Sequence, residues 1–238
     1  MTEPINCVEF ETILDLNLVY ATQAHCCKFK NIQITHKNHL AEFKELGYKF
    51  FQNNSHTVHV RNELAAGRRP ERCSDCWEHE DKGIESWRMM KNKLRDDNPP
   101  ISINLQLSSL CNHACFYCVP NLSSTIQKFK SWFNPLTESV TETNIHENKH
   151  IITLGHVKEY IENLPIENKV LSMGMTGGEP FITDEFYDHF ESLILAFCSK
   201  DPSRKFQFEI STNTNVKVEN LNRFYETISR LKEKFSNF

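Results

Sequence analysis

The second half of the chain repeats a pattern in which a strand-like run of hydrophobic positions is followed by a helix-like run. Apolar residues alternate with polar residues from Ile101 to Leu107, as in a strand with one face toward packed helices. An apolar run at residues 170–175 and an alternating run at 206–210 predict two more strands. Thr183 has the residue type and position of an N-cap for the helix predicted after the second of these three strands. Apolar positions at helical spacing predict a helix after each strand: Val157, Tyr160, Ile161 and Leu164; Phe186, Phe190, Leu193, Ile194 and Phe197; Leu221, Phe224, Tyr225, Ile228 and Leu231.

The order of these elements predicts an α/β fold. Repeated strand–helix units need crossover connections, and these connections join parallel strands. Such sheets place their reactive groups at the carboxyl ends of the strands. Three distinctive segments directly follow the three predicted strands: Cys111–Cys118, Gly177–Pro180 and Ser211–Asn213. We therefore expect these segments to meet at one edge of the sheet.

A charged, proline-containing segment precedes this region. Residues 95–100 read Arg-Asp-Asp-Asn-Pro-Pro, which suits neither a helix interior nor a central strand. Cysteines also form separate groups on its two sides, with Cys198 apart from both. The sequence therefore predicts two domains, a small cysteine-rich α+β domain at residues 1–98 and an α/β domain at residues 99–238.

Composition and charge limit the class of protein. The chain has 238 residues, of which 39% are hydrophobic and 24% are charged, as expected of a soluble globular protein. Its net charge of -4 does not support nucleic-acid binding. Residues 1–10 do not resemble a secretory signal, and no run approaches the roughly 18 apolar residues of a membrane span. Nine cysteines in such a chain favour metal ligation in a reducing compartment, so we expect a cytoplasmic protein without a membrane partner.

Three cysteines lie within eight residues directly after the first predicted strand. Cys111, Cys115 and Cys118 provide three thiolates, and the run contains no fourth cysteine. An iron–sulfur cube normally takes four thiolates, so three leave one iron open to another ligand. A zinc site completed by His113 or by a distant histidine is the alternative interpretation of this run alone.

The three-cysteine run and the Gly-Gly-Glu-Pro sequence at Gly177–Pro180 together resemble the radical S-adenosylmethionine (radical SAM) superfamily. The resemblance covers about Ile101 to Asn213. It implies that the three cysteines hold a [4Fe-4S] cluster whose open iron binds the amino and carboxylate groups of S-adenosylmethionine. It also implies an enzyme in which the reduced cluster cleaves this cofactor, and the resulting 5′-deoxyadenosyl radical removes a hydrogen atom from a substrate.

The same resemblance implies further cofactor contacts. The two glycines permit close approach of the backbone, and Glu179 and nearby carbonyls accept hydrogen bonds from the cofactor ammonium. Tyr117 matches an aromatic position near adenine, although packing is an equal alternative for it. Ser211 and Asn213 are weaker candidates, because such residues also commonly end strands. The predicted cofactor-binding residues are Tyr117, Gly177, Gly178, Glu179, Pro180, Ser211 and Asn213.

A second group of cysteines in the first part of the chain also has metal-ligand spacing. Cys73 and Cys76 form a knuckle in a segment that resembles the twitch or SPASM-type auxiliary-cluster region of the same superfamily. The resemblance implies four ligands, namely Cys7, one of Cys26 and Cys27, Cys73 and Cys76. Four ligands close a cluster, which would then serve electron transfer or structure. A zinc knuckle is the alternative.

Members of the superfamily usually have six strand–helix units, and about three are recognisable in this sequence. We therefore expect a partial radical SAM (β/α) barrel that is truncated at its C-terminal side or completed by a second polypeptide. Residues 119–149 are expected to cover the substrate side or to form a solvated insertion. The expected partners are S-adenosylmethionine, an electron-donor protein and an unidentified peptide or small-molecule substrate. The alternative function is a non-catalytic metal-binding or interaction module, or an inactive fragment of such an enzyme.

Overall fold

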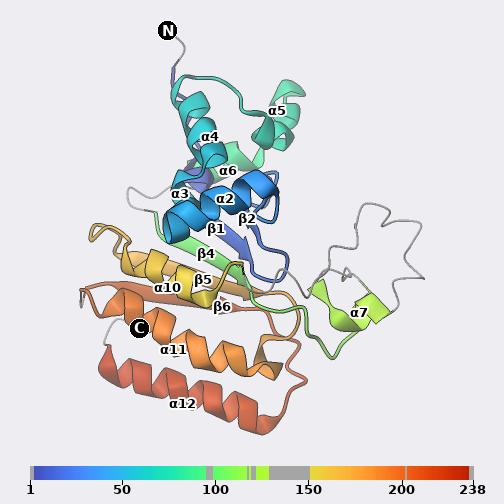
Figure 1. Ribbon diagram of the computed structural model, residues 1–238, viewed down its shortest axis with the longest axis vertical. Coiled ribbons are helices and arrows are strands. Elements are labelled where there is room, and N and C mark those ends of the chain that lie inside the picture. Colours follow the sequence, from blue (N-terminus) through green and yellow to red (C-terminus); the bar gives the residue numbers. More distant parts are fainter. Residues whose placement is uncertain are drawn as a thin grey trace.

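The computed structural model describes residues 3–94, 99–116, 118, 122–128, 151–201 and 203–235 (Figure 1). Within these residues the strands form one six-stranded sheet, in the order β3-β2-β1-β4-β5-β6. The strands are β1 (Ile13–Asn17), β2 (Thr22–Ala24), β3 (Ile32–Gln33), β4 (Ile101–Gln106), β5 (Val170–Thr176) and β6 (Lys205–Ile210).

The second half of the chain contains the three strand–helix units that the hydrophobic pattern predicts. Strands β4, β5 and β6 are parallel, with Ile103 opposite Met173 and Met173 opposite Phe208. The expectation of an α/β fold with parallel strands is therefore confirmed. The helices that follow these strands are α10 (Leu154–Glu162), α11 (Asp184–Cys198) and α12 (Val218–Lys234).

The first part of the chain adds three strands to the same sheet. Strand β1 is parallel to β4, with Leu14 opposite Ile103, whereas β2 and β3 continue the sheet in antiparallel fashion. The sheet thus includes strands from both sides of the predicted domain boundary. Residues 95–98 of that boundary lie outside the described residues.

Short helices of the first part gather near the β1–β3 end of the sheet (Figure 1). Helix α3 (Phe50–Asn53) contacts α10: the Phe51 and Tyr160 rings lie 5.8 Å apart, and Gln52 Nε2 donates to the Tyr160 hydroxyl at 2.9 Å. The helices are α1 (Val8–Thr12), α2 (Lys37–Leu46), α3 (Phe50–Asn53), α4 (Ser55–Ala65), α5 (Ser74–Asp81) and α6 (Trp87–Lys93). Among the described helices, none has both the length and the apolar character needed to cross a membrane.

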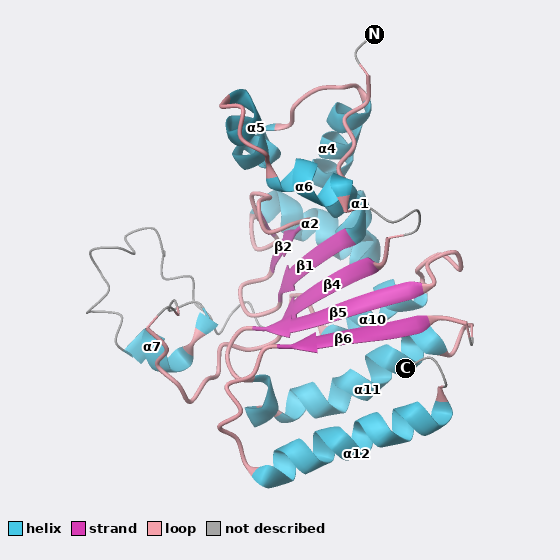
Figure 2. Ribbon diagram, turned by 180° about the vertical axis from the view of Figure 1, so that it is seen from behind, coloured by secondary structure: helices cyan, strands magenta, loops and turns pink. Residues whose placement is uncertain are grey.

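The two faces of the sheet differ in chemistry because side chains alternate along each strand. One face is apolar and buried, with Leu14, Ile103 and Met173 in register across three strands. Figure 2 shows the strands in front of α10, so this helix covers the face turned away from the viewer. The other face has polar residues at the matching positions: Asp15, Asn17, Asn104, Gln106, Thr176 and Glu209.

Candidate functional site

The loop that contains the three clustered cysteines follows the carboxyl end of β4. The Cys118 main-chain N–H donates to the Cys115 carbonyl at 2.9 Å, and the Cys111 N–H donates to Ser124 Oγ at 3.0 Å. Ser124 begins α7 (Ser124–Lys128), which lies beyond the arrowheads of the parallel strands in Figure 2. All three cysteines are half-buried. The structure therefore presents three partly accessible thiols at the carboxyl edge of the sheet.

The turn after β5 packs directly against this cysteine loop. The Gly178 N–H donates to the Leu122 carbonyl and the Glu179 N–H donates to the Leu110 carbonyl, both at 2.7 Å. Leu110 precedes the first cysteine and Leu122 follows the last. The turn therefore binds both ends of the loop through main-chain hydrogen bonds.

Both glycines of this turn are required by the local backbone. Gly177 and Gly178 have φ values of +80° and +62°, which L-residues with a side chain rarely adopt. A Cβ atom on Gly178 would lie 2.4 Å from the Leu110 carbonyl oxygen, and one on Gly177 would lie 2.4 Å from Gln106 Cγ. The close approach that these glycines permit in the structure is to the cysteine loop and to β4.

Glu179 joins the turn after β5 to the loop after β6. Its side chain is buried, with only 1% of the residue exposed. Oε1 accepts from the Phe181 N–H at 3.2 Å and from Thr212 Oγ1 at 2.8 Å, and Oε2 accepts from the Asn213 N–H at 2.6 Å. The carboxylate thus has three donors from the protein itself, and its predicted contact with a cofactor ammonium stays a prediction.

The loop after β6 reaches back to the cysteine loop. Asn213 Nδ2 lies 2.9 Å from Asn112 Oδ1 and 3.9 Å from Cys111 Sγ. Asn215 Nδ2 lies 2.9 Å from His113 Nε2. The segments that follow β4, β5 and β6 therefore lie together at one edge of the sheet, as the order of elements predicts.

The remaining predicted cofactor residues have mixed outcomes. Tyr117 lies outside the described residues. Ser211 extends the pairing of β6 with β5, because its N–H donates to the Met175 carbonyl at 3.1 Å. Pro180 is buried, and its carbonyl accepts a hydrogen bond from Thr183 Oγ1 at 3.1 Å. Thr183 occupies the predicted N-cap position of α11, but its hydroxyl makes no capping hydrogen bond to that helix.

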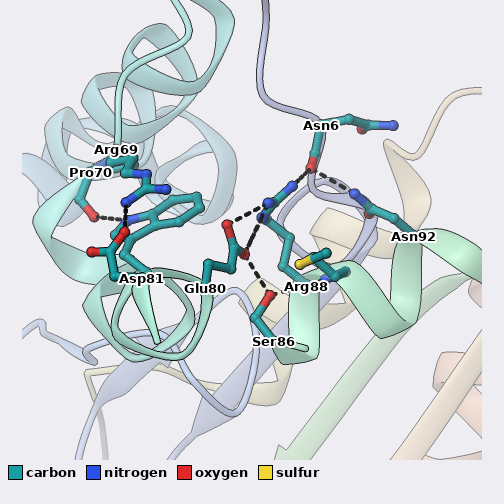
Figure 3. Close-up of polar contacts among 10 residues, drawn as sticks. Asn6, Arg69, Pro70, Glu80, Asp81, Ser86, Arg88 and Asn92 are labelled. Carbon is teal, nitrogen blue, oxygen red and sulfur yellow. Dashed lines mark hydrogen bonds and ion pairs between the residues drawn. The ribbon is translucent and has the colours of Figure 1, made fainter. Parts of the chain in front are cut away.

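A network of hydrogen bonds connects Asn6, near the start of the chain, to helices α5 and α6. Cys73 is the N-cap of α5, Cys76 lies within α5, and α6 is the next helix. Figure 3 shows Arg88 between Glu80 and Asn6. The Arg88 guanidinium donates to both Glu80 carboxylate oxygens at 2.8–3.1 Å and to the Asn6 carbonyl at 2.9 Å. Asn92 Nδ2 donates to the same carbonyl at 2.8 Å. Helices α5 and α6 therefore hold Asn6, the residue before Cys7, in place.

Four cysteines of this part interact electrostatically. Burial, with a smaller contribution from the charge of Cys76, raises the pKa of Cys7 to about 11. Burial likewise raises the pKa of Cys73 to about 12, with added contributions from Cys7 and Cys76. The pKa of Cys26 is also raised, chiefly by burial and then by Cys7, Cys27 and Cys73. The thiols of Cys7, Cys26 and Cys73 therefore stay protonated at neutral pH unless a metal centre displaces their protons.

The structure distinguishes the adjacent Cys26 and Cys27, which the sequence does not. Cys26 is buried and interacts with Cys7 and Cys73. Cys27 is exposed. Its pKa is raised first by partial burial and then by the nearby carboxylates of Glu9 and Asp15. Cys26 is therefore the member of the pair that lies with the other thiols.

Both cysteine groups have donors of the type that iron–sulfur clusters use, three thiols in one group and four in the other. Arg88 favours the ionised form of Cys7 and Cys73, and Asn213 directs an N–H toward Cys111 Sγ. Across the described ranges, no three Cys, His, Asp or Glu side chains are as closely arranged as a bound metal ion requires. The donor chemistry thus fits iron–sulfur clusters, whereas the side-chain positions are not those of a metal-bound site.

Comparison with protein-family models, curated proteins and solved structures gives no match. An assignment of function therefore depends on the residues and on their geometry. The three loops that meet at the carboxyl edge of the sheet are the principal observation, because the sequence motifs that predict chemistry lie on two of them.

A polar groove on the open face of the sheet was not predicted from the sequence. Asn104 donates to the Asp15 carboxylate, and Asn17 Nδ2 donates to Gln106 Oε1 at 2.6 Å. Burial raises the pKa of Asp15, and the hydrogen bond from Asn104 partly opposes this rise. The groove has a volume of about 430 Å³ and also touches Thr176, Cys26 and Cys27. The only feature of the sequence that indicates this groove is the set of polar residues that alternate with apolar residues along the strands.

Proposed function

We propose that this chain is a radical SAM enzyme that binds a [4Fe-4S] cluster through Cys111, Cys115 and Cys118. The pair of main-chain hydrogen bonds from Gly178 and Glu179 to the two ends of the cysteine loop is the observation that supports it best. Three cysteines in a loop can serve a structural zinc site, but a zinc site does not require a glycine turn from the next strand. The resemblance to the radical SAM superfamily implies such a turn beside an open iron, where backbone groups would contact S-adenosylmethionine close to the cluster.

The residues of the chain have separate roles in this proposal. Cys111, Cys115 and Cys118 would hold the cluster, which would supply the electron for reductive cleavage of S-adenosylmethionine. The carbonyls of the glycine turn would accept hydrogen bonds from the cofactor ammonium, and Glu179 fixes that turn relative to the loop after β6. The polar groove between Asp15 and Thr176 receives the substrate. Its amide and carboxylate groups orient the substrate by hydrogen bonding.

We also infer an auxiliary cluster at Cys7, Cys26, Cys73 and Cys76. Their mutual electrostatic effects and the framework around Arg88 support this ligand set. Four thiolates close the coordination of a cluster, so its role is electron transfer or structure. An electron-donor protein is the corresponding partner.

A second polypeptide is proposed to extend the sheet at β6. Strand β6 lies at the end of the strand order within the described residues. Its outer edge is the place where further strands of a barrel would pair. The substrate groove would then be enclosed from that side.

Anaerobic reconstitution with iron and sulfide tests the proposed enzyme. The wild-type chain should hold about eight irons if both clusters form, and it should release 5′-deoxyadenosine from S-adenosylmethionine under reduction. Cys115→Ala should lose about four irons and all cleavage. Cys198→Ala is the matched control, because this buried thiol lies on α11 away from both cysteine groups.

Two results would contradict the proposal. The first is a chain that retains zinc and excludes iron. The second is a chain with well-formed clusters that releases no 5′-deoxyadenosine. Either result would favour the non-catalytic metal-binding module.

A further inference from the structure

Asn213 is held in a fixed position beside the cysteine loop. Its main-chain N–H donates to Glu179 Oε2 at 2.6 Å, and Glu179 is itself buried. Its side-chain Oδ1 accepts from the Asn215 main-chain N–H at 2.9 Å. The residue therefore has anchors on both its backbone and its side chain, and these anchors come from two different loops.

The orientation of the Asn213 amide follows from groups whose hydrogen-bonding character is unambiguous. A main-chain N–H can only donate, so the atom that faces the Asn215 N–H must be Oδ1. The Asn112 amide donates from Nδ2 to the Asn215 carbonyl, which can only accept, and this leaves Asn112 Oδ1 toward Asn213. Both lines of reasoning place Asn213 Nδ2 on the side of the cysteine loop.

The two N–H bonds of that amide have two acceptors within reach. One acceptor is Asn112 Oδ1 at 2.9 Å, and the other is Cys111 Sγ at 3.9 Å. A sulfur atom accepts at longer distances than oxygen, and a thiolate accepts better than a thiol. The amide thus has one N–H available for the sulfur of the first cluster ligand.

We propose that Asn213 is a positioning residue that raises the reduction potential of the cluster at Cys111, Cys115 and Cys118 by donating an N–H to Cys111 Sγ. The inference rests on the proposed function above. Hydrogen bonds to ligand sulfurs are among the factors that set iron–sulfur potentials. Reduction adds negative charge to the cluster and its sulfurs, so an N–H donor stabilises the reduced form more than the oxidised form.

Redox titration of the reconstituted chain, followed by electron paramagnetic resonance, tests this inference. The relevant signal is the one that changes when S-adenosylmethionine is added, since only a cluster with an open iron can respond. In Asn213→Ala the equilibrium constant for reduction should fall about fivefold, which is about 40 mV for one electron. In Asn213→Asp the potential should fall further, because a carboxylate replaces the N–H donor with a negative charge.

Asn215→Ala is the matched control. It removes the contact between Asn215 Nδ2 and His113 from the same loop, but it leaves the main-chain groups that orient Asn213. Its potential should equal that of the wild type. An equal drop in the control, an unchanged potential in Asn213→Ala, or loss of iron from both Asn213 variants would overturn the inference. A wild-type chain that forms no S-adenosylmethionine-responsive cluster would instead refute the proposed function itself.

Discussion

At the scale of single residues, the site depends on positions where one side chain decides whether two loops fit together. Gly178 leaves room for the Leu110 carbonyl, and Glu179 accepts hydrogen bonds from two loops at once. Neither role depends on a bound cofactor. Substitutions here are therefore expected to act first on the fold of the site and only then on its chemistry.

Gly178→Ala should lower the free energy of unfolding by about 2 kcal/mol or more. The left-handed backbone accounts for about 1 kcal/mol, and the clash of the new Cβ with the Leu110 carbonyl oxygen adds to it. Gly83→Ala is the matched control, because Gly83 has φ +70° and no atom within 4 Å of an added Cβ. Urea unfolding measures both variants. Equal losses in the two would show that the contact with the cysteine loop is unimportant.

His25 should make the metal-free chain less stable as the pH falls from about 6.5 toward 4. Burial lowers its folded-state pKa from 6.5 to about 4, so the unfolded chain takes up a proton before the folded chain does. Its contribution is complete above pH 6.5, and the loss reaches about 3 kcal/mol near pH 4. Urea unfolding at several pH values in this range gives the free energy of unfolding as a function of pH. This free energy should fall less steeply with decreasing pH in His25→Gln than in the wild type, and an equally steep fall would contradict this prediction.

At the scale of elements, the Arg88 guanidinium joins α6 to Glu80 on α5, and the sequence alone does not show how buried this ion pair is. The Arg88 and Glu80 side chains are only 17% and 11% exposed, whereas Arg69 and Asp81 form a pair in which the side chains are 48% and 63% exposed. Both guanidiniums lie over the Trp77 ring, at 5.2 Å and 5.5 Å from its centre. The two arginines thus share a ring contact and differ in burial.

Arg88→Ala should lower the free energy of unfolding by about 3 kcal/mol, and it should also lower the iron content of the proposed auxiliary site. Its loss leaves the Glu80 carboxylate, whose side chain is only 11% exposed, without its cation, and it removes one donor from the Asn6 carbonyl, next to Cys7. Arg69→Ala should cost about 1 kcal/mol or less, because exposed ion pairs contribute little. Thermal or urea unfolding and iron analysis of the two variants check the difference. Similar losses in both would contradict it.

At the scale of the whole molecule, the central sheet makes one unit from the two parts of the chain. Strand β1 lies between β2 and β4, and Leu14 and Leu16 belong to the same buried cluster as Ile103 and Leu105. Separating the two parts would expose the β4 edge and these apolar side chains. The cysteine-rich part is therefore a structural component of the sheet as well as a candidate cluster site.

The full chain should unfold in one cooperative transition. Because β1 and β4 share the core, the free energies of their unfolding are coupled. Urea unfolding followed by far-ultraviolet circular dichroism and by tryptophan fluorescence should give coincident curves, since Trp77 and Trp87 report on the first part. Two separate transitions would indicate that the parts fold independently.

Local patterns in the amino-acid sequence are sufficient to specify the three strand–helix units, from β4 to α12, and the edge at which their loops meet. Each element has its own hydrophobic face, and the crossovers between strands impose parallel pairing. The cysteine and glycine motifs likewise identify the candidate site from the sequence alone. This is possible because their chemistry depends on residue types at short spacing.

Which distant segments lie side by side depends instead on the tertiary structure. Strand β1 has five residues, too few to specify a partner 89 positions away, as Asp15 and Asn104 show. The separation of Cys26 from Cys27 and the contact between Asn213 and Cys111 are equally non-local. Such contacts depend on how buried surfaces pack together in three dimensions, and a short local pattern contains no information about that packing.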